Sequence, residues 1–103
     1  MAKILVFIKE VGKKAKHVYI SPTAENLQKH LGGTPLIQKY AEDACIISLA
    51  DAEFTDKHYN CTVLGKQFFG EIIFAGVSGS DFTDCPASMD EMKKLFPQLF
   101  KEA

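Results

Sequence analysis

The chain has 103 residues, of which 47% are hydrophobic, and its 12 basic and 13 acidic side chains give a formal net charge of -1. This length suits one domain with its own core, residues 1–103, and the composition excludes a disordered chain. The charge balance gives no electrostatic reason to bind nucleic acid or an anionic membrane. All 12 basic residues are lysine, so the bidentate side chain that usually reads phosphate and guanine is missing. We therefore do not expect nucleic acid as a partner.

The cysteines and the N-terminal run bear on the cellular compartment. Cys45, Cys61 and Cys85 are an odd number and contain no C-x-x-C pair, so we expect no disulfide framework and a reducing environment. Cys85 precedes Pro86 in a loop-like segment and is expected to be the most exposed thiol. The apolar run 4–8 is too short for a signal-peptide core or a membrane span. The sequence therefore predicts a cytoplasmic protein without membrane association.

The first two expected elements are strands. Residues 3–9 form a continuous apolar run that is typical of a strand buried on both faces. Residues 16–20 predict a second strand. Gly12 lies in the short turn between them, so a hairpin is the simplest connection.

The next expected element is a helix over residues 22–31. Ser21 suits the N-cap position and Pro22 the first helical position. The following apolar residues recur at helical spacing. Gly32 and Gly33 are expected to end the helix.

The middle of the chain predicts further strands. Residues 34–43 and 44–50 have strand patterns, with Glu42 and Asp43 as a turn between them. The polar segment 51–60 predicts a long loop, and residues 61–65 form a candidate short strand.

The C-terminal third predicts a final strand and a final helix. Residues 70–76 have the strand pattern, and Ser88 with Glu91 has the spacing of a capping box. Pro97 removes a backbone donor and should bend or split the last turn. One apolar stripe is expected on this helix, made of Met92, Leu95, Phe96, Leu99 and Phe100.

The expected order is strand–strand–helix–strand–strand–(strand)–strand–helix. Short connections between strands favour antiparallel pairing, and two amphipathic helices need an apolar surface to cover. We therefore predict an α+β fold of two layers, in which a mostly antiparallel sheet of about five strands carries both helices on one face.

The segment Gly-Val-Ser-Gly-Ser at 76–80 raises the question of a reactive serine or a phosphate loop. A nucleophile elbow needs G-x-S-x-G with a helix directly after it, and here the second glycine comes one position early. A phosphate loop would end in G-K-[ST], and Asp81 and Asp84 would repel an anion. We expect a strand end and a flexible link without catalytic residues. Ser78, Ser80 and Asp81 stay candidates for lining a binding site.

No pattern indicates a metal or another cofactor. His58 and Cys61 are three residues apart, but two further ligands would have to come from distant segments. We therefore expect no metal site and no cofactor, with His58 solvated and Cys61 in the core.

Phenylalanines gather around the final strand. A stacking platform for single-stranded nucleic acid is one interpretation, with Lys66 beside the rings, and a phenylalanine-rich core is the favoured one. Phe68 and Phe69 are adjacent, so they cannot both point to the same face of a strand. An exposed member of this pair would mark a protein interface.

Three segments carry a resemblance to a known family. They are "ILVFIKEVGKKAKHVYI" followed by "TAENLQKHLGG", then "GEIIFAG", and then "SDFTDCPASMDEM". Together they resemble the small proteins of domain-of-unknown-function family 3846, which are common in gut Firmicutes, phages and mobile elements. The middle segment "DAEFTDKHYNCTVLGKQFFG" departs from the family, whose members often have a glycine- and proline-rich segment there. The resemblance implies a bacterial, phage-related setting, and it assigns no activity and no catalytic residues to this chain.

The sequence favours a non-enzymatic binding or accessory protein that acts through a protein partner or self-association. The alternative is a binding protein for a small ligand such as a nucleotide, with its pocket formed by residues 76–84 and 51–60. An enzyme is the least favoured of the three, because no catalytic constellation is present.

Overall fold

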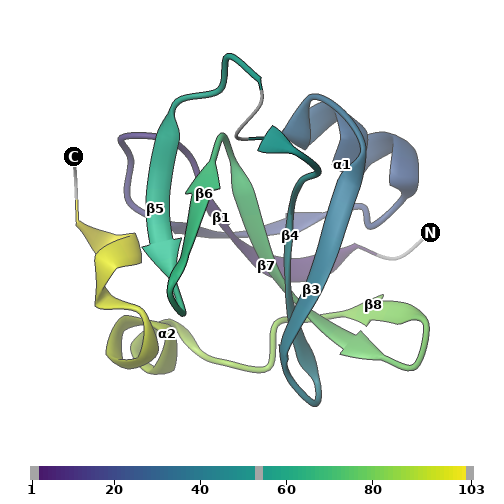
Figure 1. Ribbon diagram of the computed structural model, residues 1–103. Coiled ribbons are helices and arrows are strands. Elements are labelled where there is room, and N and C mark those ends of the chain that lie inside the picture. Colours follow the sequence, from purple (N-terminus) through teal and green to yellow (C-terminus); the bar gives the residue numbers. More distant parts are fainter. Residues whose placement is uncertain (1–2, 53–54, 102–103) are drawn as a thin grey trace.

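In the computed structural model, which describes residues 3–52 and 55–101, eight strands and three helices follow one another (Figure 1). The strands are β1 (Ile4–Lys9), β2 (Lys16–Ile20), β3 (Pro35–Ala41), β4 (Ala44–Leu49), β5 (Tyr59–Val63), β6 (Lys66–Phe69), β7 (Ile72–Ser78) and β8 (Asp81–Thr83). The helices are α1 (Ala24–Leu31), α2 (Met89–Leu95) and the 3-10 helix η2 (Pro97–Phe100). No helix in the described part of the chain is long and apolar enough to cross a membrane.

Six strands form one sheet in the order β2-β1-β7-β4-β3, and β8 extends it by pairing with β7. Strands β5 and β6 form a separate hairpin. Every strand pair in the described part of the chain is antiparallel. The α+β class and the antiparallel sheet are confirmed, and Glu42 and Asp43 form the expected turn between β3 and β4.

The expectation that both helices pack on one face of the sheet is wrong. Leu27 of α1 belongs to a core cluster with Ile73, whereas Met92 of α2 belongs to a second cluster with Ile72. Successive side chains of a strand point to opposite faces, so the neighbours Ile72 and Ile73 belong to different cores. Figure 1 shows α1 and α2 at opposite corners of the molecule. Strand β7 is apolar on both faces, and this two-sided pattern requires a cover on each side.

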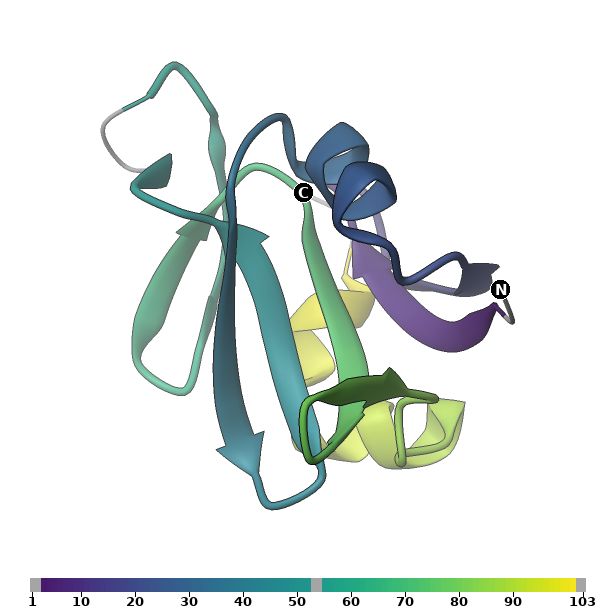
Figure 2. The same cartoon turned by 90° about the vertical axis from the view of Figure 1, so that its right-hand side faces the viewer.

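The β5–β6 hairpin shares the α2 side of the sheet, so the expected two layers become three. Its inward residues Cys61, Val63 and Phe68 are buried in the same cluster as Met92. Figure 2 shows the sheet between the hairpin and α1. The sequence prediction considered only the two helices as covers of the sheet and therefore missed the hairpin. The hairpin segment was hard to recognise as a cover because its outward-facing residues are polar.

Asn60 fixes the hairpin to the sheet. Its side-chain amide donates to the backbone oxygens of Lys9 at 2.8 Å and Gly70 at 2.7 Å. The ammonium group of the buried Lys9 donates back to Asn60 Oδ1 at 3.0 Å, and burial lowers the pKa of this lysine. One side chain therefore joins β1, β5 and the start of β7.

Helix α1 begins two residues later than expected. Thr23, in place of Ser21, is the N-cap, and its hydroxyl accepts from Asn26 N at 3.2 Å. Ser21 instead uses its backbone oxygen to accept from the Asn26 side chain at 2.8 Å. The glycine stop is confirmed, because Gly32 has the left-handed conformation with φ 83°.

The C-terminal helix has the predicted capping box between Ser88 and Glu91. Pro97 ends it as expected, and the chain continues as the 3-10 helix η2. Leu95 is 59% exposed, so the predicted apolar stripe is wrong at this position, although Leu95 lies in the same helix as the buried Met92. Phe96 and Leu99 are buried as expected.

Residues 76–80 are not a flexible link. Gly76 and Ser78 belong to β7, and Ser78 pairs with Asp81 across a two-residue turn to β8. The turn carries Gly79 at φ 63° followed by Ser80, which matches the glycine-first type II′ hairpin turn. The hairpin turn accounts for the glycine and serine at these positions. The same residue types occur in phosphate loops and nucleophile elbows, which explains the similarity of the sequence pattern.

Candidate functional site

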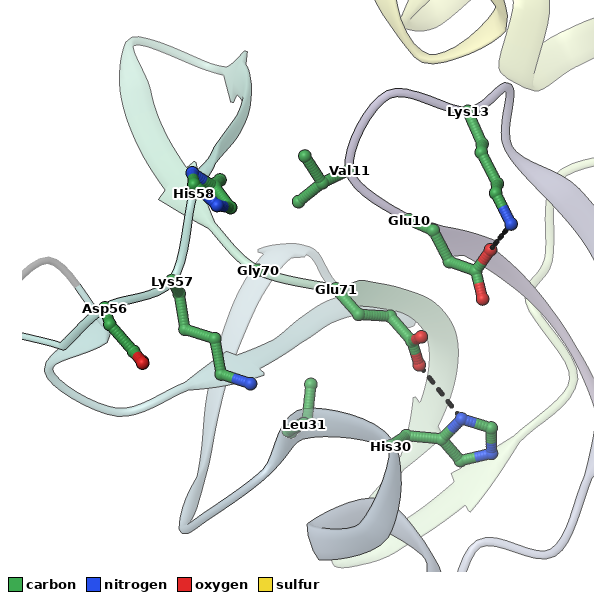
Figure 3. A pocket seen from close by; sticks show the side chains of 10 residues that line it. All are labelled: Glu10, Val11, Lys13, His30, Leu31, Asp56, Lys57, His58, Gly70 and Glu71. Atoms are coloured by element: carbon green, nitrogen blue, oxygen red, sulfur yellow. Dashed lines mark hydrogen bonds and ion pairs between the residues drawn. The ribbon is translucent and has the colours of Figure 1, made fainter.

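A cleft of about 520 Å³ lies where four segments meet (Figure 3). We call it the charged cleft. The β1–β2 turn, the C-terminal end of α1, residues 56–58 and the bend before β7 each contribute side chains. Its lining residues are Glu10, Val11, Lys13, His30, Leu31, Asp56, Lys57, His58, Gly70 and Glu71. The volume lies within the range of small-molecule sites.

An imidazole–carboxylate pair forms one wall of the charged cleft. His30 lies in the last turn of α1, and its Nδ1 is 2.9 Å from Oε2 of Glu71. The Glu71 side chain is only 18% exposed. Burial raises the pKa of Glu71, and the pairing with His30 acts in the opposite direction without cancelling the effect of burial. This carboxyl therefore accepts a proton more readily than an exposed glutamate does.

Glu10 is held by two lysines at the rim. Its carboxylate lies 3.4 Å from Lys13 Nζ and 3.5 Å from Lys16 Nζ. Burial of Glu10 acts to raise its pKa, but the bonds and charges of the two lysines prevail and lower it. Glu10 therefore stays ionised and its charge is balanced within the protein.

Lys57 faces the end of α1. A methyl group in place of the Gly32 hydrogen would lie 3.0 Å from Lys57 Nζ, so the ammonium group sits directly over this glycine. The C-terminus of a helix carries unsatisfied carbonyl oxygens and a partial negative charge, which favours a cation there. Within residues 3–52 and 55–101, Lys57 has no carboxylate within ion-pair distance. Figure 3 shows its side chain extending toward Leu31.

The charged cleft carries charges of both signs. Its lining has three carboxylates, those of Glu10, Asp56 and Glu71, and two lysines, Lys13 and Lys57. Lys57 has no carboxylate within ion-pair distance in the described part of the chain, whereas Glu10 is paired with lysines. Val11 and Leu31 supply the apolar part of the wall. Lys57 is therefore the cation of this lining that is best placed to meet an anionic group of a small molecule.

The same residues offer little for nucleophilic chemistry. In the part of the chain that the structure describes, the His30 ring bonds to Glu71 and to no hydroxyl or thiol. A nucleophile would need such a contact with its base, although contacts of this kind tighten on substrate binding. The described residues also contain no group of three or more potential metal-binding side chains.

The predicted site residues lie elsewhere. Ser78, Ser80 and Asp81 are exposed on the β7–β8 hairpin, which both views place at the opposite end of the molecule from residues 56–58 (Figures 1 and 2). The pocket expected between residues 76–84 and 51–60 therefore does not form. Within 51–60, residues 53–54 lie outside the described part of the chain.

The predicted aromatic pair is not openly exposed. Phe68 is buried in the core, and Phe69 is half-buried with its ring 5.9 Å from that of Tyr59. The outward ring of the hairpin is Tyr59, which is 51% exposed. The alternation predicted for Phe68 and Phe69 is present, but the neighbouring tyrosine covers the outer ring.

The expectation of an exposed Cys85 is wrong. All three thiols are free and buried, as was expected for Cys45 and Cys61. Burial raises the pKa of Cys45 and of Cys61 to about 11, and it also raises the pKa of Cys85. Cys85 is covered because its backbone N–H donates to Leu5 O at 2.8 Å, which anchors the segment against β1.

The charged cleft was missed because its residues are dispersed along the chain. His30 and Glu71 are 41 positions apart, and no local motif links them. The one signal in the sequence was Glu71 itself, an acidic residue between Gly70 and a strand that is otherwise apolar. A functional interpretation would have required the position of α1 relative to β7.

Comparison of the chain with models of known protein families, with curated proteins and with solved structures gives no match. The resemblance to family 3846 therefore stays a prediction.

Proposed function

We propose that this protein is a non-enzymatic binding protein that holds a small molecule with a carboxylate or phosphate group in the charged cleft. The observation that carries the proposal is Lys57, a lysine in the lining of the charged cleft that has no carboxylate within ion-pair distance among residues 3–52 and 55–101. A nucleotide is one member of this class. Its phosphate would face Lys57, and the rest would lie along Val11 and Leu31.

Several features support binding over catalysis. The charged cleft is open to solvent and is lined by side chains from four segments of the chain. His30 lacks a hydroxyl or thiol partner in the described chain, and a proton acceptor alone does not complete a nucleophilic site. Three free thiols fit a reducing compartment and support a cytoplasmic protein.

The test is a titration with inorganic phosphate and with a simple dicarboxylate, followed by two-dimensional amide NMR. We expect saturable shifts confined to the amides of Lys57, His58, Gly70 and Glu71. Lys57→Met should weaken the affinity about 10- to 100-fold, since a charge-assisted hydrogen bond contributes about 1.5–3 kcal/mol. Added salt should weaken binding to the unmodified protein.

The matched control is Lys94→Met, which removes an exposed lysine on α2. It should leave the affinity unchanged. The proposal fails if Lys57→Met and Lys94→Met behave alike, or if the shifts do not saturate or appear outside the charged cleft. A comparison of the spectra of both variants without ligand shows whether each keeps the fold.

A further inference from the structure

Two side chains of opposite charge span the same two segments of the charged cleft. Glu71, at the bend before β7, reaches His30 in the last turn of α1, with 2.9 Å between Oε2 and Nδ1. The side chain of Lys57 crosses between the same segments. A Cβ added at Gly70 would lie 3.4 Å from Lys57 Cδ, and one added at Gly32 would lie 3.0 Å from Lys57 Nζ. A carboxylate and an ammonium group therefore lie in one part of the cleft.

The positions of both charged groups are held by their surroundings. Gly70 N donates to His58 O at 2.9 Å, which fixes the residue after Lys57 against the bend. Figure 3 shows the Leu31 side chain between the ends of Lys57 and Glu71. Leu31 is only 2% exposed, because it belongs to the α1 core. The two charges therefore flank an apolar floor.

One oxygen of the Glu71 carboxylate is left without a donor. His30 bonds to Oε2, and within residues 3–52 and 55–101 no hydrogen bond or ion pair reaches Oε1. The side chain is only 18% exposed, and burial raises the pKa of Glu71 because the charged form is poorly solvated there. A second donor that carries a positive charge would stabilise the ionised carboxylate.

The charges of the lining favour a ligand that carries both signs. The carboxylate of Glu10 is paired with lysines, so those of Asp56 and Glu71 remain beside the ammonium group of Lys57. A simple anion would be attracted by Lys57 and repelled by the two carboxylates. A molecule with a cationic group next to its anionic group would gain from both kinds of charge.

We propose that the ligand of the charged cleft is a small amino acid, whose carboxylate binds Lys57 and whose ammonium group binds Oε1 of Glu71. This inference rests on the proposed function and narrows its ligand class. The carbon chain between the two charges lies over Leu31. His30 is a positioning residue, since it holds Oε2 of Glu71 and so directs Oε1. A phosphate compound without an ammonium group is then the poorer ligand.

The test compares ligands that differ only in the amino group. Glycine, β-alanine and γ-aminobutyrate place the amine at increasing distances from the carboxylate. Acetate, propionate and butyrate are their counterparts without the amine, and the N-acetyl derivatives of the amino acids lack its charge. The affinity of each for the full chain is measured by two-dimensional amide NMR.

We expect at least one amino acid to bind about 10- to 100-fold more tightly than its amine-free counterpart, the effect of one charge-assisted hydrogen bond. N-acetylation should remove this advantage. Lys57→Met should weaken the binding of the amino acid and of the amine-free acid alike, because both present a carboxylate.

Glu71→Gln keeps the size of the side chain and removes its charge. It should weaken binding of the amino acid about 10-fold or more and strengthen binding of the amine-free acid, so that the preference disappears. The matched control is Glu42→Gln in the exposed β3–β4 turn, which should preserve the preference. The comparison of ligands on the unmodified chain tests the inference even if Glu71→Gln does not fold.

The inference fails if no amino acid in the series binds more tightly than its amine-free counterpart, or if folded Glu71→Gln keeps the preference. Binding of the acids that depends on Lys57 but not on the amine would overturn this inference and support the proposed function. No binding of any of these compounds would overturn both.

Discussion

At the scale of single residues, Gly76 shows how closely the C-terminal segment packs on the sheet. A Cβ at this position would collide with the backbone oxygen of Asp84 and with the Thr83 hydroxyl. Asp84 cannot withdraw, because its carboxylate accepts from Leu5 N at 2.8 Å and the next residue, Cys85, donates to Leu5 O. The requirement for glycine at position 76 is therefore steric. It is not conformational, because the φ angle of Gly76 is not positive.

We expect Gly76→Ala to lower the free energy of unfolding by about 3 kcal/mol, the upper part of the range for overpacking. Gly12→Ala is the matched control, because Gly12 has φ 74° and no atom lies within 4 Å of the position that an added methyl group would take. It should cost about 1 kcal/mol from backbone strain alone. Urea unfolding followed by circular dichroism measures both. Equal losses would show that the Gly76 contact relaxes.

At the scale of elements, the β5–β6 hairpin combines a strained turn with a tight attachment. Leu64 and Gly65 occupy the two central positions with φ 51° and 79°, as in a type I′ turn. Asparagine or glycine is the usual residue at the first of them. The leucine therefore costs stability, and its side chain is 68% exposed.

Replacing Leu64 with glycine should raise the free energy of unfolding by about 0.5–1 kcal/mol, because it removes the left-handed strain. Thermal unfolding measures the effect. A loss of stability would show that contacts of the Leu64 side chain outweigh the strain of its backbone.

Local signals in the sequence predicted most elements. The glycine stop of α1, the capping box of α2 and the break at Pro97 depend on neighbouring residues, and each is present. The turn at 79–80 was missed because its glycine and serine also suit a binding loop. The exposure of Leu95 was missed because helical spacing gives the direction of an apolar stripe, whereas the width of the buried face depends on what packs against the helix.

At the scale of the whole molecule, one sheet separates two apolar cores. The α1 core and the α2 core have no buried residue in common, and Ile72 and Ile73 stand back to back between them. The sequence does not predict which helix packs on which face of the sheet, because β7 is apolar on both of its faces. The charged cleft depends on this placement, and so it could not be predicted either.

Because the cores are separate, Ile72→Val and Ile73→Val should each cost about 0.5–1.5 kcal/mol and should add within about 0.5 kcal/mol in the double variant. Ile47 and Ile73 are cross-strand partners in one core. The pair Ile47→Val and Ile73→Val should therefore depart from additivity by more than that. Denaturant unfolding of the single and double variants gives the coupling free energy of each of the two double-mutant cycles. Strong coupling between residues 72 and 73 would mean that the sheet transmits packing changes between its faces.

The attachment through Asn60 has a mechanical consequence. Asn60 belongs to β5, and the oxygen of Gly70, which accepts from its amide at 2.7 Å, begins the bend that carries Glu71 into the charged cleft. The hairpin and one wall of the charged cleft are therefore joined through a single side chain. We expect a displacement of the hairpin to move the bend at Gly70, so that the shape of the charged cleft changes with the position of the hairpin.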